Sequence, residues 1–309
     1  MIAAGNHYIY PPCCPLTPNV APSSSLKHRS KHHGQCRHLN PPQTTGAAAS
    51  LAASHSAEHP LKLYGGWFCP FVQRAWIALV EKKIDHQYVE INPYKKEPEF
   101  LALNPRGLVP ALGLPDPPRA VLYESSVICE YLDERYADEA VHGKPLLPGN
   151  AYERARARLW IDHVSTRVVP GFYKLLQHTD GKSALSIEET RREFLGHVRT
   201  LVKEMASSGP FFLGETFSLV DISLAPWAKR LWLIDHYKNG GVGIPQDGQD
   251  GDDEVWGRWR AWFKAVTERP SVKETWSDDE RYLAAYKRYA DNTTNSLVGQ
   301  ATRAGSGLP

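Results

Sequence analysis

The sequence predicts a small α/β domain followed by an all-helical domain. In the first half, short apolar runs with the alternation of strands are separated by turns and by helical runs, for example at 61–63 and 86–91. From residue 152 onward, apolar residues instead recur at the i, i+3 and i+4 spacing of helices buried on one side. The predicted order in the first half is strand, helix, strand, short helix, two strands and helix.

The first strand and helix place a cysteine at a helix start. The stretch 61–74 reads LKLYGGWFCPFVQR, in which a short alternating run leads into a Gly-Gly turn and Cys69-Pro70 opens an apolar helical run. Proline fits the first helical turn, where its missing N–H is no loss. Free N–H groups and the helix dipole favour an anion there, and the anion of cysteine is the nucleophilic thiolate. We therefore expect Cys69 to be a reactive thiol with a lowered pKa.

The middle of the α/β domain contains a proline where a strand is expected. A strand at 86–91 is followed by a short helix at 98–103 and a turn at 104–107. The next strand, 108–112, contains Pro110, which cannot donate a hydrogen bond to a central ladder. This conflict indicates an unusual backbone, and we predict a cis peptide bond between Val109 and Pro110.

The last strand of this domain, 120–123, runs directly into a helix. Glu124 and Ser125 open the helix, which is predicted to continue through Tyr136. Serine and glutamate suit the free N–H groups and the dipole of a first helical turn. Cys129 lies among apolar residues in the middle of this helix, so we expect it to be packed in the core.

The helical domain follows a Gly/Pro-containing linker at 143–149. Helices are predicted at 152–177 with a break at Pro170-Gly171, at 187–206, around 256–266 and at 280–290. Another helix begins at Ser218, because Ser218 and Asp221 form a Ser-x-x-Asp capping box before an apolar run. We assign these two residues a structural role.

Both ends of the chain lack a hydrophobic period. Residues 1–58 contain no acidic residue before Glu58 and are predicted to be a disordered extension, and the Gly/Ser/Thr-rich residues 292–309 to be a disordered tail. The predicted domains therefore cover 59–140 and 149–291. An acid-free leader fits either an organelle transit peptide or a dispensable extension. We expect a cytoplasmic protein, with an organelle as the alternative.

The composition is ordinary for a globular protein. Of the 309 residues, 42% are hydrophobic and 23% charged, and the net charge of +2 gives no reason to expect nucleic-acid binding. No stretch approaches the roughly 18–20 apolar residues that span a membrane. The cysteines form no disulfide framework, and the histidine-rich run 28–38 matches no four-ligand zinc pattern. We expect a reducing compartment, no membrane partner and no metal.

Three motifs in the first domain carry a family resemblance. They are Cys69-Pro70-Phe71 with Gln73-Arg74, then Asn104-Pro105-x-Gly107-x-Val109-Pro110, then Tyr123-Glu124-Ser125. With them, residues from about 61 to 290 resemble glutathione S-transferases and, within that family, the omega class. The resemblance implies a thioredoxin-like, glutathione-binding domain at 59–140, the all-helical C-terminal domain of that architecture, glutathione as co-substrate, and a homodimer.

The resemblance also implies which residues bind the first two parts of glutathione. Glu124 matches the residue that binds the γ-glutamyl ammonium group. Ser125 and the free N–H groups beside it would bind the γ-glutamyl carboxylate. Val109 matches the residue whose backbone pairs with the cysteinyl part, exposed by the cis Pro110.

The remaining implied site residues surround the thiol. Lys96 resembles the lysine that binds the glycyl carboxylate, but the register differs by about one residue, so Lys95 is an alternative. Phe71 would line the pocket. Cys69 stands where other classes use a Tyr or Ser hydroxyl, which implies a mixed disulfide with glutathione and thiol–disulfide exchange.

The acceptor is expected to bind between the domains. By resemblance, Arg230 falls at the position of a pocket arginine, and Tyr282 and Tyr289 fall in the helix that closes the pocket; packing against the first domain is the alternative role of both tyrosines. Omega-like relatives also reduce dehydroascorbate and S-glutathionylated ketones with the same cysteine. The acceptor is thus a small molecule or a glutathionylated compound.

Three alternatives share the same cysteine motif. A lambda-like or dehydroascorbate-reducing relative is the main alternative among enzymes. A glutathione-binding ligand carrier with little turnover is another. Chloride intracellular channel proteins have a similar Cys-Pro-Phe-x-Gln-Arg start, but here the apolar stretch runs into Glu81-Lys82-Lys83, which disfavours membrane insertion.

Overall fold

The structure is a computed structural model that describes residues 43–117 and 120–309. The described residues form one compact unit. Most of the predicted extension, including the histidine-rich run and the residues that would form a transit peptide, lies outside the described residues.

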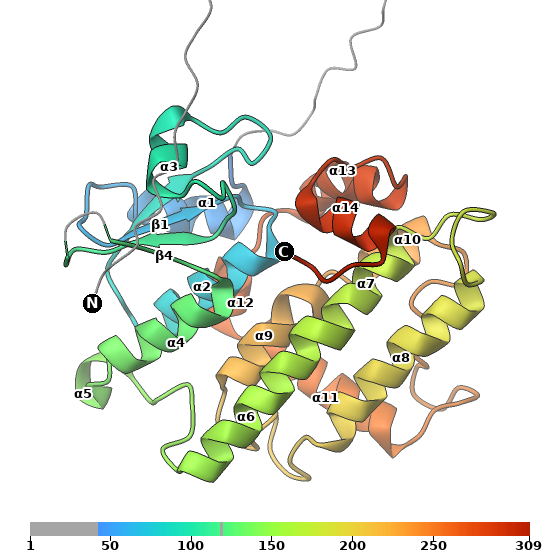
Figure 1. Ribbon diagram of the computed structural model, residues 1–309. Helices are drawn as coiled ribbons and strands as arrows, with labels where there is room; N and C mark the ends of the chain where they lie inside the picture. The colour runs from blue at the N-terminus through green and yellow to red at the C-terminus, as the bar shows by residue number, and fades with distance from the viewer. Residues whose placement is uncertain (1–42, 118–119) are drawn as a thin grey trace, which may run out of the picture. The chain divides into compact units, whose positions relative to one another are not determined.

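The described chain begins with mixed α/β elements and ends with helices only (Figure 1). The elements are α1 (Gly46–Ser54), β1 (Lys62–Gly65), α2 (Pro70–Glu81), β2 (Gln87–Glu90), α3 (Pro98–Leu103), β3 (Ala111–Gly113), β4 (Val121–Tyr123), α4 (Ser125–Arg135), α5 (Glu139–His142), α6 (Ala151–His163), the π-helix η1 (Val164–Val168), α7 (Val169–Leu176), α8 (Ile187–Lys203), α9 (Leu219–Ala228), α10 (Trp232–Tyr237), α11 (Glu254–Glu268), α12 (Pro270–Glu274), α13 (Asp279–Ala290) and α14 (Leu297–Ala304).

The four strands form one mixed sheet in the order β2-β1-β3-β4. β1 pairs with β2 in parallel, whereas the β1–β3 and β3–β4 pairs are antiparallel. The predicted element order of the first half is therefore confirmed. Strand β3 begins only at Ala111, because Pro110 before it has no N–H to donate to the ladder.

Helix α2 packs against β1 through a glycine. A Cβ atom at Gly65 would collide with the side chain of Val72, so only glycine allows this approach of strand and helix. This close contact between β1 and α2 also fixes the turn 66–69, in which the Cys69 N–H donates to the carbonyl of Gly66 at 2.9 Å. The sequence between strand and helix thus determines where residue 69 lies.

The long helical run that starts after the linker has no break at Pro170-Gly171. Helices α6 and α7 are joined through η1, and the proline lies in the first turn of α7, where no N–H is required. The irregularity of this run is instead the π-helix η1, which lies just before Pro170. The Ser165 hydroxyl of η1 accepts a hydrogen bond from Arg74 of α2 at 3.4 Å.

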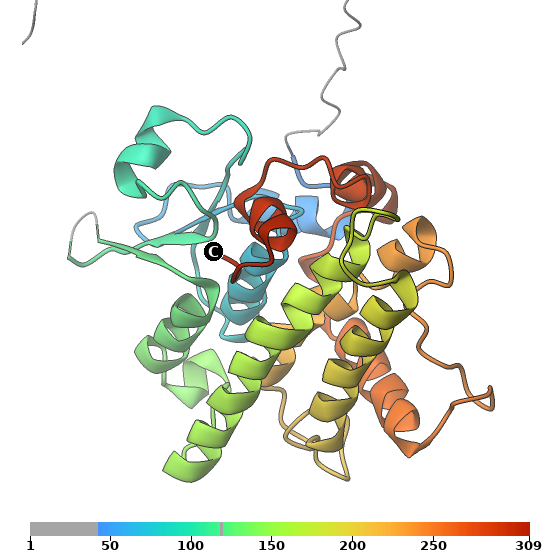
Figure 2. The same cartoon turned by 45° about the vertical axis from the view of Figure 1, so that its right-hand side comes forward.

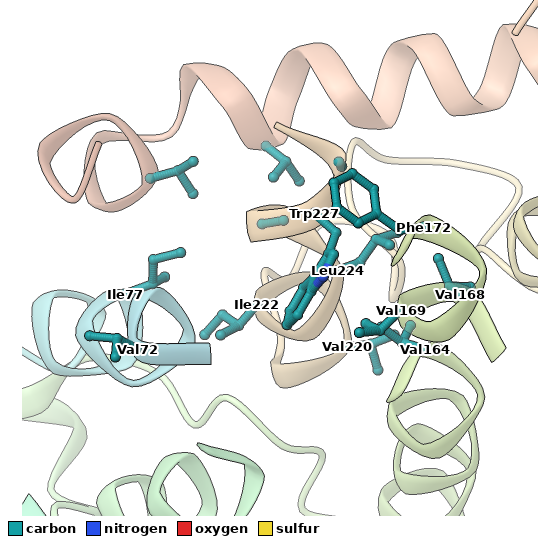
Figure 3. Close-up of a cluster of buried hydrophobic side chains, with 14 of the residues drawn as sticks. Val72, Ile77, Val164, Val168, Val169, Phe172, Val220, Ile222, Leu224 and Trp227 are labelled. Atoms are coloured by element: carbon teal, nitrogen blue, oxygen red, sulfur yellow. The ribbon is translucent and has the colours of Figure 1, made fainter. Parts of the chain in front are cut away.

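The two halves of the unit share one hydrophobic core. Figure 3 shows Val72 and Ile77 of α2 facing Ile222 of α9, and beyond α9 the side chains of η1 and α7. All of these side chains are buried.

The capping box predicted before α9 is confirmed, since the Asp221 carboxylate accepts from the Ser218 N–H at 2.9 Å and from its hydroxyl at 2.8 Å.

Two predictions of disorder are wrong. Residues 46–54 of the supposed extension form α1, where Ala48 is buried and donates its N–H to the carbonyl of Trp276. Residues 297–304 of the supposed tail form α14, which contacts α7 (Figures 1 and 2). Both helices are short, and both are held by contacts with residues distant in sequence, which a local pattern does not record.

None of the described helices is long and apolar enough to cross a membrane.

Candidate active site

A cavity of about 320 Å³ surrounds the start of α2. The sheet half contributes the residues that follow β2, precede β3 and follow β4, and the helical half contributes α7, α13 and α14. The lining residues are Phe68, Cys69, Pro70, Phe71, Pro93, Tyr94, Lys96, Arg106, Gly107, Leu108, Val109, Pro110, Tyr123, Glu124, Ser125, Tyr173, Tyr286, Tyr289, Asn295, Ser296, Leu297, Val298 and Pro309.

Cys69 lies in this cavity as the residue before the first turn of α2. Its thiol is 3.8 Å from the carbonyl oxygen of Val109. Burial raises the pKa of the Cys69 thiol, against the lowering effects of the N–H groups of Val72 and Phe71 and of two buried arginines, Arg230 and Arg74. The predicted position is confirmed, but the predicted lowering of the pKa is wrong, because loss of water around the sulfur outweighs the helix start.

The peptide bond between Val109 and Pro110 is cis, as predicted. Both residues line the cavity beside Cys69. The turn before them is held by Asn104, whose side-chain amide donates to the carbonyl of Leu108 at 2.9 Å. The Val109 backbone is thereby presented to the cavity at the level of the thiol.

Glu124 and Ser125 lie at the start of α4 and line the cavity, as predicted. Glu124 has a φ of 69°, a left-handed conformation that is uncommon outside glycine. Its carboxylate accepts from the guanidinium of Arg106 at 2.5 Å. Ser125 is buried, and its hydroxyl accepts from Arg74 at 3.4 Å.

The two candidate lysines are separated by the structure. Lys96 lines the cavity, whereas Lys95 is exposed and does not. Phe71 lines the cavity and packs edge-on against Trp227 of α9, with ring centroids 4.8 Å apart. Lys96 is therefore the residue placed to meet a ligand carboxylate.

Two of the three residues predicted for the acceptor pocket do not reach it. Arg230 is fully buried beneath Cys69, where it donates to the carbonyl of Phe68 at 3.4 Å and to the side chain of Gln73 at 2.6 Å. Tyr282 is also fully buried and stacks on Trp276 with ring centroids 4.0 Å apart. The pocket role predicted for Arg230 and Tyr282 is wrong, because both side chains turn into the core. The alternative role of Tyr282 is confirmed, since its ring packs edge-on against Trp67 of the first domain with ring centroids 5.2 Å apart.

Tyr289 does line the cavity, and its hydroxyl donates to Ser296 at 2.9 Å. One helical turn earlier, Tyr286 also lines it and donates to the carbonyl of Phe68 at 3.1 Å. Tyr282, Tyr286 and Tyr289 lie on one face of α13, because residues four and seven positions apart are on the same side of a helix, so spacing alone could not have separated Tyr286 from Tyr282.

Other lining residues escaped the sequence reasoning. Tyr173 comes from α7, and residues 295–298 come from the start of α14. Tyr94 stacks on Phe68 with ring centroids 6.1 Å apart, and the guanidinium of Arg288 lies 5.1 Å from the centroid of its ring. We call the lining residues of the helical half, which are Tyr173, Tyr286, Tyr289, residues 295–298 and Pro309, the helical wall, and those of the sheet half the sheet wall. The helical wall is lined mainly by tyrosines and by the apolar Leu297 and Val298.

The cavity has an uneven charge distribution. Among its lining residues, the cations are Lys96 and Arg106 and the anion is Glu124, and all three come from the sheet half. Within residues 43–117 and 120–309, no group of three or more His, Cys, Asp or Glu side chains could hold a metal ion. The arrangement suits an organic ligand that carries a net negative charge at the sheet wall and presents a sulfur atom to Cys69.

Comparison with known proteins gives a consistent result for both halves. The family model of the glutathione S-transferase N-terminal domain matches residues 68–135, and that of the C-terminal domain matches residues 184–265. Glutathione S-transferase omega-1 of Sus scrofa is 33% identical over 196 residues, which cover 62% of this chain and 77% of that protein.

Solved structures of similar fold include glutathione transferase Omega 3C from Trametes versicolor. It is 39% identical with a TM-score of 0.69, and the match covers 82% of this chain and all of that one (100%). A rice glutathione S-transferase solved in complex with glutathione is 25% identical with a TM-score of 0.62, and the match covers 77% of this chain and 100% of that one.

Proposed function

The chain belongs to the glutathione S-transferase family, and on that premise we propose that it is a glutathione-dependent thiol transferase of the omega type with Cys69 as its nucleophile. The observation that carries the proposal is the position of Cys69 in the cavity, beside the Val109 carbonyl and between a charged wall and an aromatic one. A cysteine there reacts by forming a disulfide, which a hydroxyl group cannot do.

The reaction would proceed in two exchanges. The Cys69 thiolate attacks the glutathione sulfur of a mixed disulfide, the sulfur–sulfur bond breaks, and the acceptor leaves as a thiolate that takes up a proton. Cys69 then carries glutathione in a disulfide. The thiolate of a second glutathione attacks this glutathione sulfur, which releases glutathione disulfide and restores the Cys69 thiolate.

The second exchange needs external glutathione because no second cysteine of the described residues is suited to resolve the disulfide. Residue 72 is Val, so the motif is not Cys-x-x-Cys. Cys129, the other free cysteine among the described residues, is buried in α4, where burial raises the pKa of its thiol to about 12. Cys129 is therefore no nucleophile at neutral pH and cannot resolve the disulfide between Cys69 and glutathione.

Glutathione would bind along the sheet wall and the acceptor along the helical wall. Ser125 and the N–H groups at the start of α4 would bind the γ-glutamyl carboxylate, and Lys96 the glycyl carboxylate. The tyrosines and α14 would contact the acceptor. Dehydroascorbate and S-glutathionylated ketones remain candidate acceptors beside mixed disulfides, with glutathione as the electron donor.

The decisive experiment measures turnover of a glutathione mixed disulfide and of dehydroascorbate, side by side, for wild type and Cys69→Ser. We expect Cys69→Ser to lose at least about 100-fold in kcat with both acceptors, since the serine hydroxyl cannot form the disulfide intermediate. Cys129→Ala is the matched control and should keep the wild-type rate.

Two results would contradict the proposal. If Cys69→Ser is as active as wild type with disulfides, the nucleophile is wrong. If wild type binds glutathione but turns over neither acceptor, the protein is a ligand carrier. Conjugating activity gained by Cys69→Ser would not conflict with the mechanism, because a hydroxyl restores the residue type of other classes in the family.

The protein is also proposed to act as a homodimer. Four large side chains with apolar surface are exposed on β4, α4 and α6, namely Tyr123, Val127, Tyr152 and Leu159. Exposed apolar side chains on neighbouring elements are typical of contacts between subunits. Light scattering should give twice the chain mass for wild type and a lower mass for Leu159→Lys; the chain mass for wild type would contradict the proposal.

A further inference from the structure

An ion pair stands at the entrance to the sheet wall. The guanidinium of Arg106, from the turn before β3, donates to the carboxylate of Glu124 at 2.5 Å and lies 5.0 Å from the centroid of the Tyr123 ring. Both side chains line the cavity, and both remain about half exposed, at 42% and 47%. A pair so exposed contributes little to the stability of the fold, so its position in the cavity calls for another explanation.

We propose that Arg106 joins Ser125 in binding the carboxylate at the α-amino-acid end of glutathione, beside Glu124, which by resemblance binds the ammonium group. The inference rests on the proposed function, because glutathione is the ligand that brings this end to the cavity. It adds Arg106 as a residue that determines specificity.

The geometry of the ligand matches the pair. The ammonium and carboxylate groups of an α-amino acid are attached to one carbon atom, so they approach a protein as adjacent opposite charges. Arg106 and Glu124 present adjacent opposite charges in the complementary order. The guanidinium can form two parallel hydrogen bonds with a carboxylate, which a lysine cannot do.

The charge of the cavity points the same way. The charged side chains of the lining, Lys96, Arg106 and Glu124, sum to a charge of plus one. Glutathione with a protonated thiol has two carboxylates and one ammonium group, and therefore a charge of minus one. If Arg106 served only to neutralise Glu124, the ammonium group would compete with it for one carboxylate, and Lys96 would be the one cationic side chain of the lining left for two ligand carboxylates.

The experiment compares three S-methylated peptides, which cannot form a disulfide with Cys69. They are S-methylglutathione, the same peptide with a 4-aminobutyryl group that lacks the α-carboxylate, and the same peptide with a glutaryl group that lacks the ammonium. Dissociation constants are measured by calorimetry at pH 7 for wild type, Arg106→Ala, Arg106→Lys and Glu124→Gln. Arg192→Ala, an exposed arginine of α8 outside this cavity, is the matched control.

We expect Arg106→Ala to weaken binding of S-methylglutathione about tenfold and to leave the 4-aminobutyryl peptide unchanged or tighter, as expected for loss of one charge-assisted hydrogen bond. Arg106→Lys should lie between wild type and Arg106→Ala. Glu124→Gln should weaken S-methylglutathione and leave the glutaryl peptide unchanged. The control should match wild type for all three peptides.

Other patterns overturn the inference. If Arg106→Ala binds S-methylglutathione as well as or better than wild type, Arg106 only competes with the ammonium group. If Arg106→Ala weakens S-methylglutathione and the 4-aminobutyryl peptide equally, Arg106 merely shapes the cavity. If wild type does not bind S-methylglutathione at all, the proposed function itself fails, and that result is distinct from the first two.

Discussion

The two walls of the cavity are built in different ways. The sheet wall is formed by four short segments, three of which carry their own sequence signatures around Cys69, Pro110 and Ser125, whereas the segment after β2 that contains Lys96 carries none. The helical wall is formed by side chains from α7, α13 and α14, whose positions depend on how whole helices pack. The glutathione side of the site is thus encoded locally, and the acceptor side is encoded by tertiary contacts.

The difference has a physical origin in backbone geometry. The sheet wall uses special conformations, namely the cis peptide bond before Pro110 and the left-handed Glu124, which a few residues fix by themselves. On the helical wall the backbone is regular, and Tyr282, Tyr286 and Tyr289 share one face of α13, so the position of the cavity along the helix axis decides which of them line it. Substitutions on the helical wall can therefore change which acceptor binds without disturbing the proposed glutathione site.

Among variants that separate the two walls, Ser125→Ala should produce the largest change and act on the sheet wall alone. Removing a buried hydroxyl that a ligand carboxylate needs should raise the KM for glutathione about 30-fold and leave the KM of the acceptor within about twofold. Steady-state kinetics with each substrate varied in turn would measure both. A similar rise in the two KM values would break the division between the walls.

The reactivity of Cys69 tests a place where both walls act on one atom. The thiolate is the reactive form, so alkylation accelerates about tenfold per pH unit below the pKa of the thiol. Because burial raises that pKa, the rate should still be rising above pH of about 8.5, the ordinary value for cysteine. Mass spectrometry of the peptide containing Cys69 follows it separately from the other cysteines, with Cys69→Ser as background.

An inflection below pH of about 8.5 would show that the N–H groups of α2 and the buried arginines dominate over burial at this sulfur. Alkylation of Cys129 should remain slow throughout, since its thiol is buried.

Leu297→Ala should produce the smallest change and act on the helical wall alone. The side chain is about half exposed, so its truncation should raise the acceptor KM only about threefold, with no change in the KM for glutathione. Leu185→Ala, an equally exposed leucine outside the cavity, is the matched control. An unchanged acceptor KM for Leu297→Ala would remove α14 from the acceptor site.

Most of the fold could be predicted from the sequence. So could the sheet wall, except for Arg106, Tyr94 and the neighbouring turn residues. The order of elements, the cis Val109-Pro110 bond and the start of α4 follow from turn chemistry and periodicity, and the thioredoxin-like and helical architecture follows from the family resemblance. The placement of Lys96 over Lys95 required the structure, because a shift of one residue in a loop leaves no periodic signal.

The errors concern burial and distant contacts. Arg230 could not be recognised as a core residue, because a fully buried guanidinium is rare and its partners Gln73 and Phe68 are more than a hundred positions away. The short helices α1 and α14 have little intrinsic stability and form because other parts of the chain pack against them. The raised pKa of Cys69 could not be predicted for the same reason, because a helix start in the sequence does not show how deeply the thiol is buried.

Helix α1 has a consequence for the order of folding. The family model begins to match at residue 68, yet Thr45 donates its N–H to Ser277 across 232 positions of chain, and α1 packs against α12. A single short helix has few contacts to offset the entropy of closing this loop, a cost that grows slowly with loop length. We therefore expect α1 to dock after the rest of the unit and to open before it on heating, which hydrogen exchange at the Ala48 N–H would detect.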